Sequence, residues 1–231
     1  MDNIFRLSFV NLFRNLLLVK YPLVFILIAI LSSFSLKETA KRDTTLKDTY
    51  VSPLKEFSDE WNDPKYAVCN TAANANYMTS KEKEVIHILN LARMNPQLFC
   101  STVVKTEDYE TDNEYYTSLV QTMENMKALD ILQPDKQTFQ SAQCQAITSG
   151  KIGYVGHNRQ TNNCKRLAHF YGECCSYGET DALGIVMQLL IDEGVPGYGH
   201  REICFSDEYT SIGVSIQPHK QYGLNAVLDF Y

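Results

Sequence analysis

The sequence predicts an α+β protein in which helices cover a small antiparallel sheet. Its 231 residues are enough for one domain with a substantial core and an extension. Apolar residues between 79 and 193 repeat with helical spacing, whereas residues 211–216 and 226–231 alternate as strands do. Helices that come first and strands that come late are typical of this class of fold.

Four helices are expected, and the first has the clearest start. Thr79 and Glu82 form a capping-box pattern, in which each side chain bonds the backbone amide of the other residue. An apolar stripe follows at helical spacing, and Asn95-Pro96 is expected to end or bend this helix. The other helices are expected over 115–129, after Pro134, and over 181–193.

Two strands are expected near the C-terminal end, and a turn at Tyr222-Gly223 would pair them in antiparallel fashion. Before them, residues 150–180 are rich in Gly, Asn, Cys and Tyr and show no clear period. We expect a long functional loop there, because loops carry binding and catalytic residues more often than cores do.

The N-terminal residues have the pattern of an export signal. Arg6, Arg14 and Lys20 precede an apolar run over 23–31, and small residues follow the run. The run is shorter than the ~20 residues of a transmembrane helix. We therefore expect a cleaved signal peptide over 1–35, with an uncleaved N-terminal anchor as the alternative.

Two regions are expected after this segment. Residues 36–76 are polar and mixed in charge, and they are expected to form a spacer. Trp61 and Tyr66 are the residues of the spacer that could dock on the domain. The folded domain itself is expected over 77–231.

Charge argues against nucleic acid as a partner. Residues 1–35 hold three of the 21 basic and one of the 27 acidic residues, so the remainder has a formal charge of −8. Affinity for phosphate groups comes mainly from Lys and Arg. A secreted or otherwise extracytoplasmic protein fits better, with membrane contact only through an uncleaved N-terminal segment.

All seven cysteines lie after the export-like segment. In an oxidising compartment such cysteines form disulfides, and an odd count leaves at least one free or bonded to another chain. The absence of a C-x-x-C pair disfavours a zinc ribbon.

Two histidines are the first candidates for a site. His157 and His200 each follow a glycine in an expected loop rather than in an apolar stripe. If their imidazoles converge, they could hold Zn²⁺ or another divalent cation, with water completing the shell. They could equally act as a general base and a general acid without metal.

Two acids are expected to join the histidines. Glu173 lies among glycine, cysteine and tyrosine residues, and burial of its carboxylate would call for a histidinium or a metal as partner. Asp192 lies in the last turn of an expected helix, where the helix dipole disfavours an acid by ~0.3–1 kcal/mol. His200 is close enough in the chain to offset that penalty.

Arg201 is the fifth candidate residue. It could bind a ligand carboxylate or brace a loop beside its glycine turn. No G-x-S-x-G, P-loop, H-E-x-x-H or dinucleotide motif occurs in the chain. Their absence disfavours a serine hydrolase, an NTPase and a zincin.

Together these segments resemble the CAP superfamily (cysteine-rich secretory, antigen 5 and pathogenesis-related 1 proteins), especially its bacterial members. The likeness covers about residues 77–231 and rests on five motifs in the order of the family. They are Asn90–Pro96, Gly156-His157, Gly172-Glu173, Gly199–Ile203 and Ile212–Val214.

The resemblance implies a three-layer α-β-α sandwich with a cleft of two histidines and two acids. These correspond to His157, His200, Glu173 and Asp192. The family has an asparagine after the glutamate, and Cys174 replaces it here. This departure suggests a local disulfide of Cys164 with Cys174 or Cys175.

The resemblance leaves three functions open. The first is an exported module whose cleft binds a divalent metal, a small ligand such as a lipid, or both. The second is a metal-assisted hydrolase that uses the same cleft. The third is a structural or adhesion module with a vestigial cleft. The sequence favours the first, because no nucleophile is evident and a third strong metal ligand is lacking unless Glu173 or Asp192 serves.

Overall fold

The computed structural model of the 231-residue chain describes residues 50–106, 113–167 and 172–231. Residues 51–231 form one compact unit. The expected signal segment over 1–35 lies outside the described residues, as does the first part of the expected spacer. None of the helices within the described ranges combines the length and the apolar character needed to cross a membrane.

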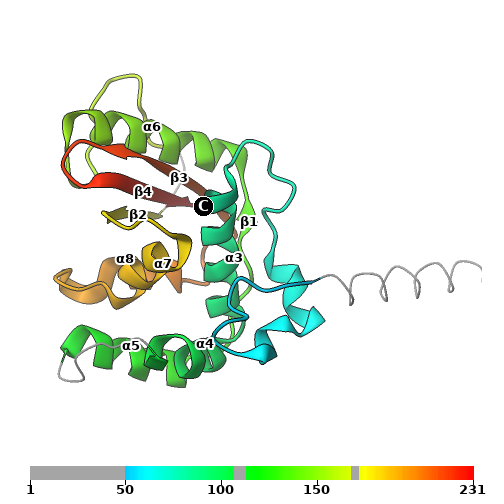
Figure 1. Ribbon diagram of the computed structural model, residues 1–231. Coiled ribbons are helices and arrows are strands. Elements are labelled where there is room, and N and C mark those ends of the chain that lie inside the picture. The colour runs from blue at the N-terminus through cyan, green and yellow to red at the C-terminus, as the bar shows by residue number, and fades with distance from the viewer. Residues whose placement is uncertain (1–49, 107–112, 168–171) are drawn as a thin grey trace, which may run out of the picture. The chain divides into compact units, whose positions relative to one another are not determined.

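A four-stranded mixed sheet forms the middle layer of the described part of the chain (Figure 1). The spatial order is β1 (Gln133–Pro134), β3 (Ser211–His219), β4 (Gly223–Phe230) and β2 (Gly172–Tyr177). The expected antiparallel pairing of β3 with β4 is confirmed. The sheet was expected to be antiparallel; β2, β3 and β4 pair in this way, whereas the two-residue strand β1 adds a parallel pairing with β3.

Helices cover both faces of the sheet, which confirms the three-layer fold (Figure 1). One face is covered by α6, and the other by α3, α7 and α8. Their bounds are Lys136–Ile152, Ser80–Met94, Ala182–Ile191 and Gly199–Cys204. A Cβ on Gly213 of β3 would lie 2.0 Å from the backbone nitrogen of Phe139 in α6. The close packing of this helix on the sheet therefore requires glycine at that position.

The first helix begins where the capping-box pattern predicts. The Glu82 carboxylate accepts from the Thr79 amide at 2.7 Å, and the Thr79 hydroxyl accepts from the Glu82 amide at 3.3 Å. Glu82 also accepts from the Ile216 amide at 2.8 Å, which explains why this acid is buried. The cap therefore also fastens α3 to β3.

The other expected helices are present, with α5 over Glu114–Asn125. Two short helices were not expected: α8, described above, and α4 over Pro96–Thr102. The expected loop over 150–180 is wrong for residues 172–177, which form β2. Nearly all residues of β2 are buried, so the strand lacks the alternation by which a half-exposed strand is detected.

The expected spacer over 36–76 is wrong for residues 51–76, which pack on the domain. Trp61 and Tyr66 are buried, and the Trp61 indole donates to the Thr102 hydroxyl at 3.0 Å. Aromatic anchors in a polar segment are enough to order it, because each buries a large apolar surface. The 3-10 helices are η1 (Asp59–Asn62), η2 (Pro64–Cys69), η3 (Val104–Thr106) and η4 (Pro196–Tyr198).

Candidate functional site

His157 is positioned by the loop that follows α6. Gly156 has a φ of 125°, a conformation that favours glycine, so the chain can turn just before the histidine. The Gly156 amide donates to the Tyr177 hydroxyl at 2.9 Å, and the Gln145 side chain donates to the Gly156 carbonyl at 3.0 Å. The loop is therefore tied to both β2 and α6.

The His157 imidazole contacts Glu173, which β2 carries. Nδ1 of the ring lies 3.0 Å from Glu173 Oε1, and the Glu173 side chain is almost fully buried. An ionised carboxylate only accepts hydrogen bonds, so Nδ1 carries the hydrogen and a neutral ring has its lone pair on Nε2. The expected partner of the buried glutamate is therefore a histidine.

Glu173 also belongs to a buried charge network behind His157. Arg159 Nη2 lies 2.8 Å from Glu173 Oε2 and 3.3 Å from Asp229 Oδ2. Glu173 and Asp229 are partners in the β2–β4 register, so two carboxylates share one guanidinium. Burial, and then the charge of Glu173, raises the pKa of Asp229. A raised pKa favours neutral Asp229, which leaves Arg159 to pair chiefly with Glu173.

The second histidine–acid pair is built where α7 ends and α8 begins. Asp192 follows α7 in the left-handed conformation with a φ of 60°, which aspartate tolerates better than most residues. Its Oδ1 lies 2.7 Å from His200 Nδ1, and its Oδ2 accepts from the His200 amide at 2.9 Å. The carboxylate orients the imidazole and satisfies amides at the start of α8. This contact offsets the unfavourable helix-end position, as expected.

The two imidazoles lie close together at one end of the pocket described below. The ring centres of His157 and His200 are 5.7 Å apart, and the ring planes are inclined by 48°. Among the described residues, no hydrogen bond engages Nε2 of either ring, whereas each Nδ1 binds a carboxylate. Two imidazoles that share a tetrahedral Zn²⁺ with bonds of about 2.0–2.1 Å have centres roughly 5 Å apart. The separation of the two rings is therefore close to that of imidazoles that share such an ion.

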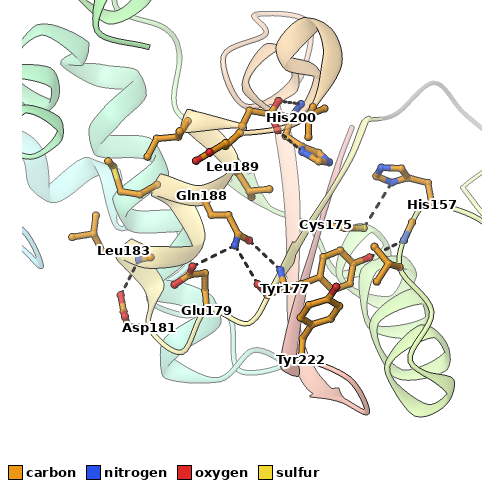
Figure 2. A pocket seen from close by; sticks show the side chains of 18 residues that line it. His157, Cys175, Tyr177, Glu179, Asp181, Leu183, Gln188, Leu189, His200 and Tyr222 are labelled. Carbon is orange, nitrogen blue, oxygen red and sulfur yellow. Dashed lines mark hydrogen bonds and ion pairs between the residues drawn. The ribbon is translucent and has the colours of Figure 1, made fainter. Parts of the chain in front are cut away.

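Cys175 places a thiol beside His157 (Figure 2). Its Sγ lies 3.7 Å from His157 Nδ1, and with Glu173 the group offers three candidate metal-binding atoms within 4.8 Å of one another. Burial raises the pKa of the Cys175 thiol, so the thiol keeps its proton unless a metal displaces it. The Nδ1 side of His157 is therefore a less favourable place for an ion than the Nε2 side.

A pocket of about 860 Å³ extends from the two histidines along α7 (Figure 2). Its walls combine aliphatic side chains, two tyrosines and four acids, and none of its lining residues is Lys or Arg. The aliphatic residues are Val155, Leu183, Met187, Leu189, Ile191 and Val195, and the acids are Glu179, Asp181, Asp192 and Glu193. The size is that of a small-molecule site, and the acids disfavour an anionic ligand.

Arg201 does not line this pocket. Its guanidinium donates to the carbonyls of Leu190, Ile191 and Tyr115, and to the Ser118 hydroxyl, at 2.5–3.0 Å. The guanidinium also stacks over the Tyr198 ring at 4.2 Å. With its donors committed to protein oxygens, the structure favours the bracing role, and we do not include Arg201 among the ligand-binding residues.

The expected disulfide of Cys164 with Cys174 or Cys175 is wrong. Cys164 bonds Cys144 of α6 instead, across a sequence separation of 20. The bond fastens the end of the loop that carries His157 to the helix before it. Sequence spacing alone does not decide such pairings, because the geometry of the two Cβ atoms does. The free cysteines Cys69, Cys100, Cys174, Cys175 and Cys204 are all buried.

The first motif, Asn90–Pro96, stabilises the fold and does not line the pocket. Asn90 exchanges hydrogen bonds with the Leu132 backbone at 2.8 and 3.0 Å. Arg93 donates to the Cys204 carbonyl at 2.7 Å, at the end of α8. These buried polar groups position the segments that surround the site.

Sequence reasoning missed Arg159, Asp229 and Cys175 at the site. Asp229 carried a detectable signal, since an acid within a strand that is buried on both faces requires a partner. Arg159 lies two residues beyond His157 and was the nearest available cation on that loop. The sequence could not single out Cys175, because the adjacent Cys174 is the same residue type. The two cysteines differ only in the face of β2 on which each lies.

Comparison with known proteins gives one family. The model of the cysteine-rich secretory protein family, CAP, matches residues 86–230, which is more than half of the chain. No curated protein and no solved structure matches the chain. The matched region runs from α3 through β4 and contains both histidine–acid pairs. The chain therefore belongs to the CAP family of cysteine-rich secretory proteins.

Proposed function

We propose that this protein binds a divalent transition-metal ion such as Zn²⁺ between His157 and His200. The observation that supports this is that carboxylates hold both rings through Nδ1 while the ring centres lie 5.7 Å apart. Carboxylate partners of this kind fix the tautomer of a metal-binding histidine and raise its basicity. Glu173 and Asp192 would orient the two imidazoles, and an ion held by them could also bind water or a small molecule.

The proposal includes a small ligand in the adjoining pocket. Leu183 and Met187 on α7 offer an aliphatic wall that suits an apolar chain. The acids Glu179 and Glu193 disfavour a carboxylate head group unless a bound cation neutralises them. A neutral single-chain lipid fits this combination.

Export is also part of the proposal. The disulfide between Cys144 and Cys164 supports an oxidising compartment, because disulfides are rare in reducing cytosol. The export-like pattern over residues 1–35 supports the same location. The Asn90–Pro96 motif supports placement near the bacterial members of the family.

Calorimetric titration with zinc chloride tests the metal site. Wild type should bind one ion, and His157→Ala and His200→Ala should each weaken binding by at least about tenfold, because each removes a ligand. His87→Gln is the matched control, since His87 is buried in α3 and does not line the pocket. Equal zinc binding by wild type and both alanine variants would remove the metal proposal.

Decanol tests the pocket independently of the metal. Leu183→Glu should abolish decanol binding measured by calorimetry, because it places a charge in the aliphatic wall. Ile147→Glu is the control, since Ile147 is exposed on α6 and lies outside the pocket. If the Leu183 variant binds decanol as tightly as wild type does, decanol does not bind in this pocket.

A further inference from the structure

Cys174 and Cys204 bring two buried thiols together at the contact between β2 and α8. Both residues are almost completely inaccessible to solvent. The Cys174 Sγ lies 3.6 Å from the His200 carbonyl oxygen. After burial, the neighbouring Cys204 thiol is the next cause that raises the pKa of the Cys174 thiol. Neither of these cysteines takes part in the disulfide that the structure contains.

The close approach follows from how β2 packs against α8. A Cβ on Gly172 would lie 2.7 Å from the Ile203 side chain, so the strand presses directly on this helix. Cys174 is two residues further along the strand and therefore lies on the same face as Gly172. Cys204 follows Ile203 and lies one helical turn beyond His200, whose carbonyl the Cys174 thiol contacts.

The other free cysteines have different neighbours. Cys175 lies on the opposite face of β2, against α6 and His157. Cys69 contacts the Met94 sulfur at 3.3 Å, and Cys100 contacts the Val120 carbonyl. Among the described residues, Cys174 and Cys204 are thus the two free thiols that β2 and α8 bring into each other's neighbourhood.

We propose that Cys174 and Cys204 form a second disulfide when the chain folds in an oxidising compartment. A thiolate of one cysteine attacks a small disulfide such as glutathione disulfide, which gives a mixed disulfide and one released glutathione thiol. The other cysteine then displaces the second glutathione. One sulfur–sulfur bond replaces two S–H bonds, and the two electrons and two protons leave with the two glutathione thiols.

This disulfide would join the two halves of the cleft. Cys174 is bonded in sequence to Glu173, which orients His157, and Cys204 is on the same short helix as His200. A covalent bond between β2 and α8 limits how far the two imidazoles can separate. Its effect on metal affinity rests on the proposed zinc site, whereas its formation does not.

Refolding with peptide mapping tests the bond itself. Reduced, unfolded Cys175→Ser protein is refolded with glutathione disulfide until Cys144–Cys164 is complete, then alkylated, digested and analysed by mass spectrometry. The Cys175 change removes the ambiguity of adjacent cysteines. A Cys174–Cys204 peptide is expected. The proposal would be overturned if Cys174 and Cys204 are alkylated once Cys144–Cys164 is complete. It would also be overturned if either of them is bonded to a different cysteine.

Thermal unfolding and zinc titration of serine variants give the second test. Cys174→Ser and Cys204→Ser should each lower the melting temperature of the oxidised protein by roughly 5–15 °C and weaken zinc binding several-fold. The double variant should be no worse than either single variant, because all three lack the same bond. Cys100→Ser is the control, as a buried thiol elsewhere. If the double variant loses the sum of the two single decreases in melting temperature, the two cysteines do not share a bond.

If wild type does not bind zinc, the proposed metal site is wrong. The peptide map still tests the disulfide in that case.

Discussion

The two histidine–acid pairs of the cleft are built in different ways. Asp192 and His200 come from one stretch of chain, and the carboxylate binds both the imidazole and the backbone of the next helix. His157 and Glu173 come from a loop and an edge strand, and a buried guanidinium that is shared with a second carboxyl group holds the glutamate. The His200 side chain is 16% exposed, whereas that of His157 is 45% exposed.

The difference shows that the same pair of residue types can be fixed by local backbone geometry or by long-range charge. The Asp192 half is expected to be rigid, because its carboxylate also serves the start of α8. The Glu173 half is expected to respond to pH, because its geometry depends on how Glu173 and Asp229 share Arg159.

Removal of Arg159 should have the largest effect. Arg159→Met leaves the buried Glu173 carboxylate, and the Asp229 carboxyl group beside it, without their cation. This should lower the free energy of unfolding by about 3 kcal/mol or more at neutral pH. Urea unfolding measures this loss. Arg166→Met is the matched control, because Arg166 is exposed on the same loop and its loss should change stability by at most about 0.5 kcal/mol. Equal effects of the two changes would mean that the network does not support the Glu173 half.

Asp192→Ala should come next. The change removes a hydrogen bond to the imidazole and one to the His200 amide, so we expect a loss of about 2 kcal/mol in urea unfolding. It should also weaken zinc binding by roughly 10–100-fold, as loss of an orienting carboxylate does. Zinc affinity that is unchanged in this variant would show that Asp192 does not position His200 for binding.

The pH dependence of stability should come from the Glu173 half. Because the folded state raises the pKa of Asp229, it binds more protons than the unfolded state above the ordinary aspartate pKa of about 3.9. Wild type should therefore lose stability relative to Asp229→Asn as the pH rises from about 4, by at most about 1.4 kcal/mol per pH unit. Urea unfolding of both proteins between pH 4 and the raised pKa of about 7 gives the free energy of unfolding of wild type minus that of Asp229→Asn. A value that does not fall as the pH rises would contradict the raised pKa.

Tyr177→Phe should have the smallest effect. The Tyr177 hydroxyl accepts from the Gly156 amide at 2.9 Å, and its loss should lower stability by about 1 kcal/mol. The His157 loop should also exchange its amide hydrogens faster, whereas the His200 amide should not change. Faster exchange at both histidines would mean that the two halves are not independently fixed.

Local rules predicted much of the fold but only part of the site. The capping box at Thr79 and the strand pattern after 211 depend on neighbouring residues, so the sequence alone located α3, β3 and β4. The helix-end position of Asp192 likewise pointed to His200, only eight residues away. These elements are specified by spacing that a single sequence displays.

The Glu173 half could not be predicted in the same way. Arg159, Glu173 and Asp229 meet only because β2 pairs with β4 and the loop after α6 closes over them. β2 itself is buried on both faces and has no alternation to reveal it. The same long-range packing decided that Cys164 bonds Cys144 rather than Cys174 or Cys175.

The most direct test of the account is nitrogen NMR of histidine-labelled protein during zinc titration. Both His157 and His200 should carry hydrogen on Nδ1 before zinc is added, and zinc should shift the Nε2 resonance of both rings together while each Nδ1 keeps its hydrogen. A shift confined to one ring would contradict a shared ion. Zinc binding at Nδ1 of His157 would instead place the ion with Glu173 and Cys175 and contradict the proposed site.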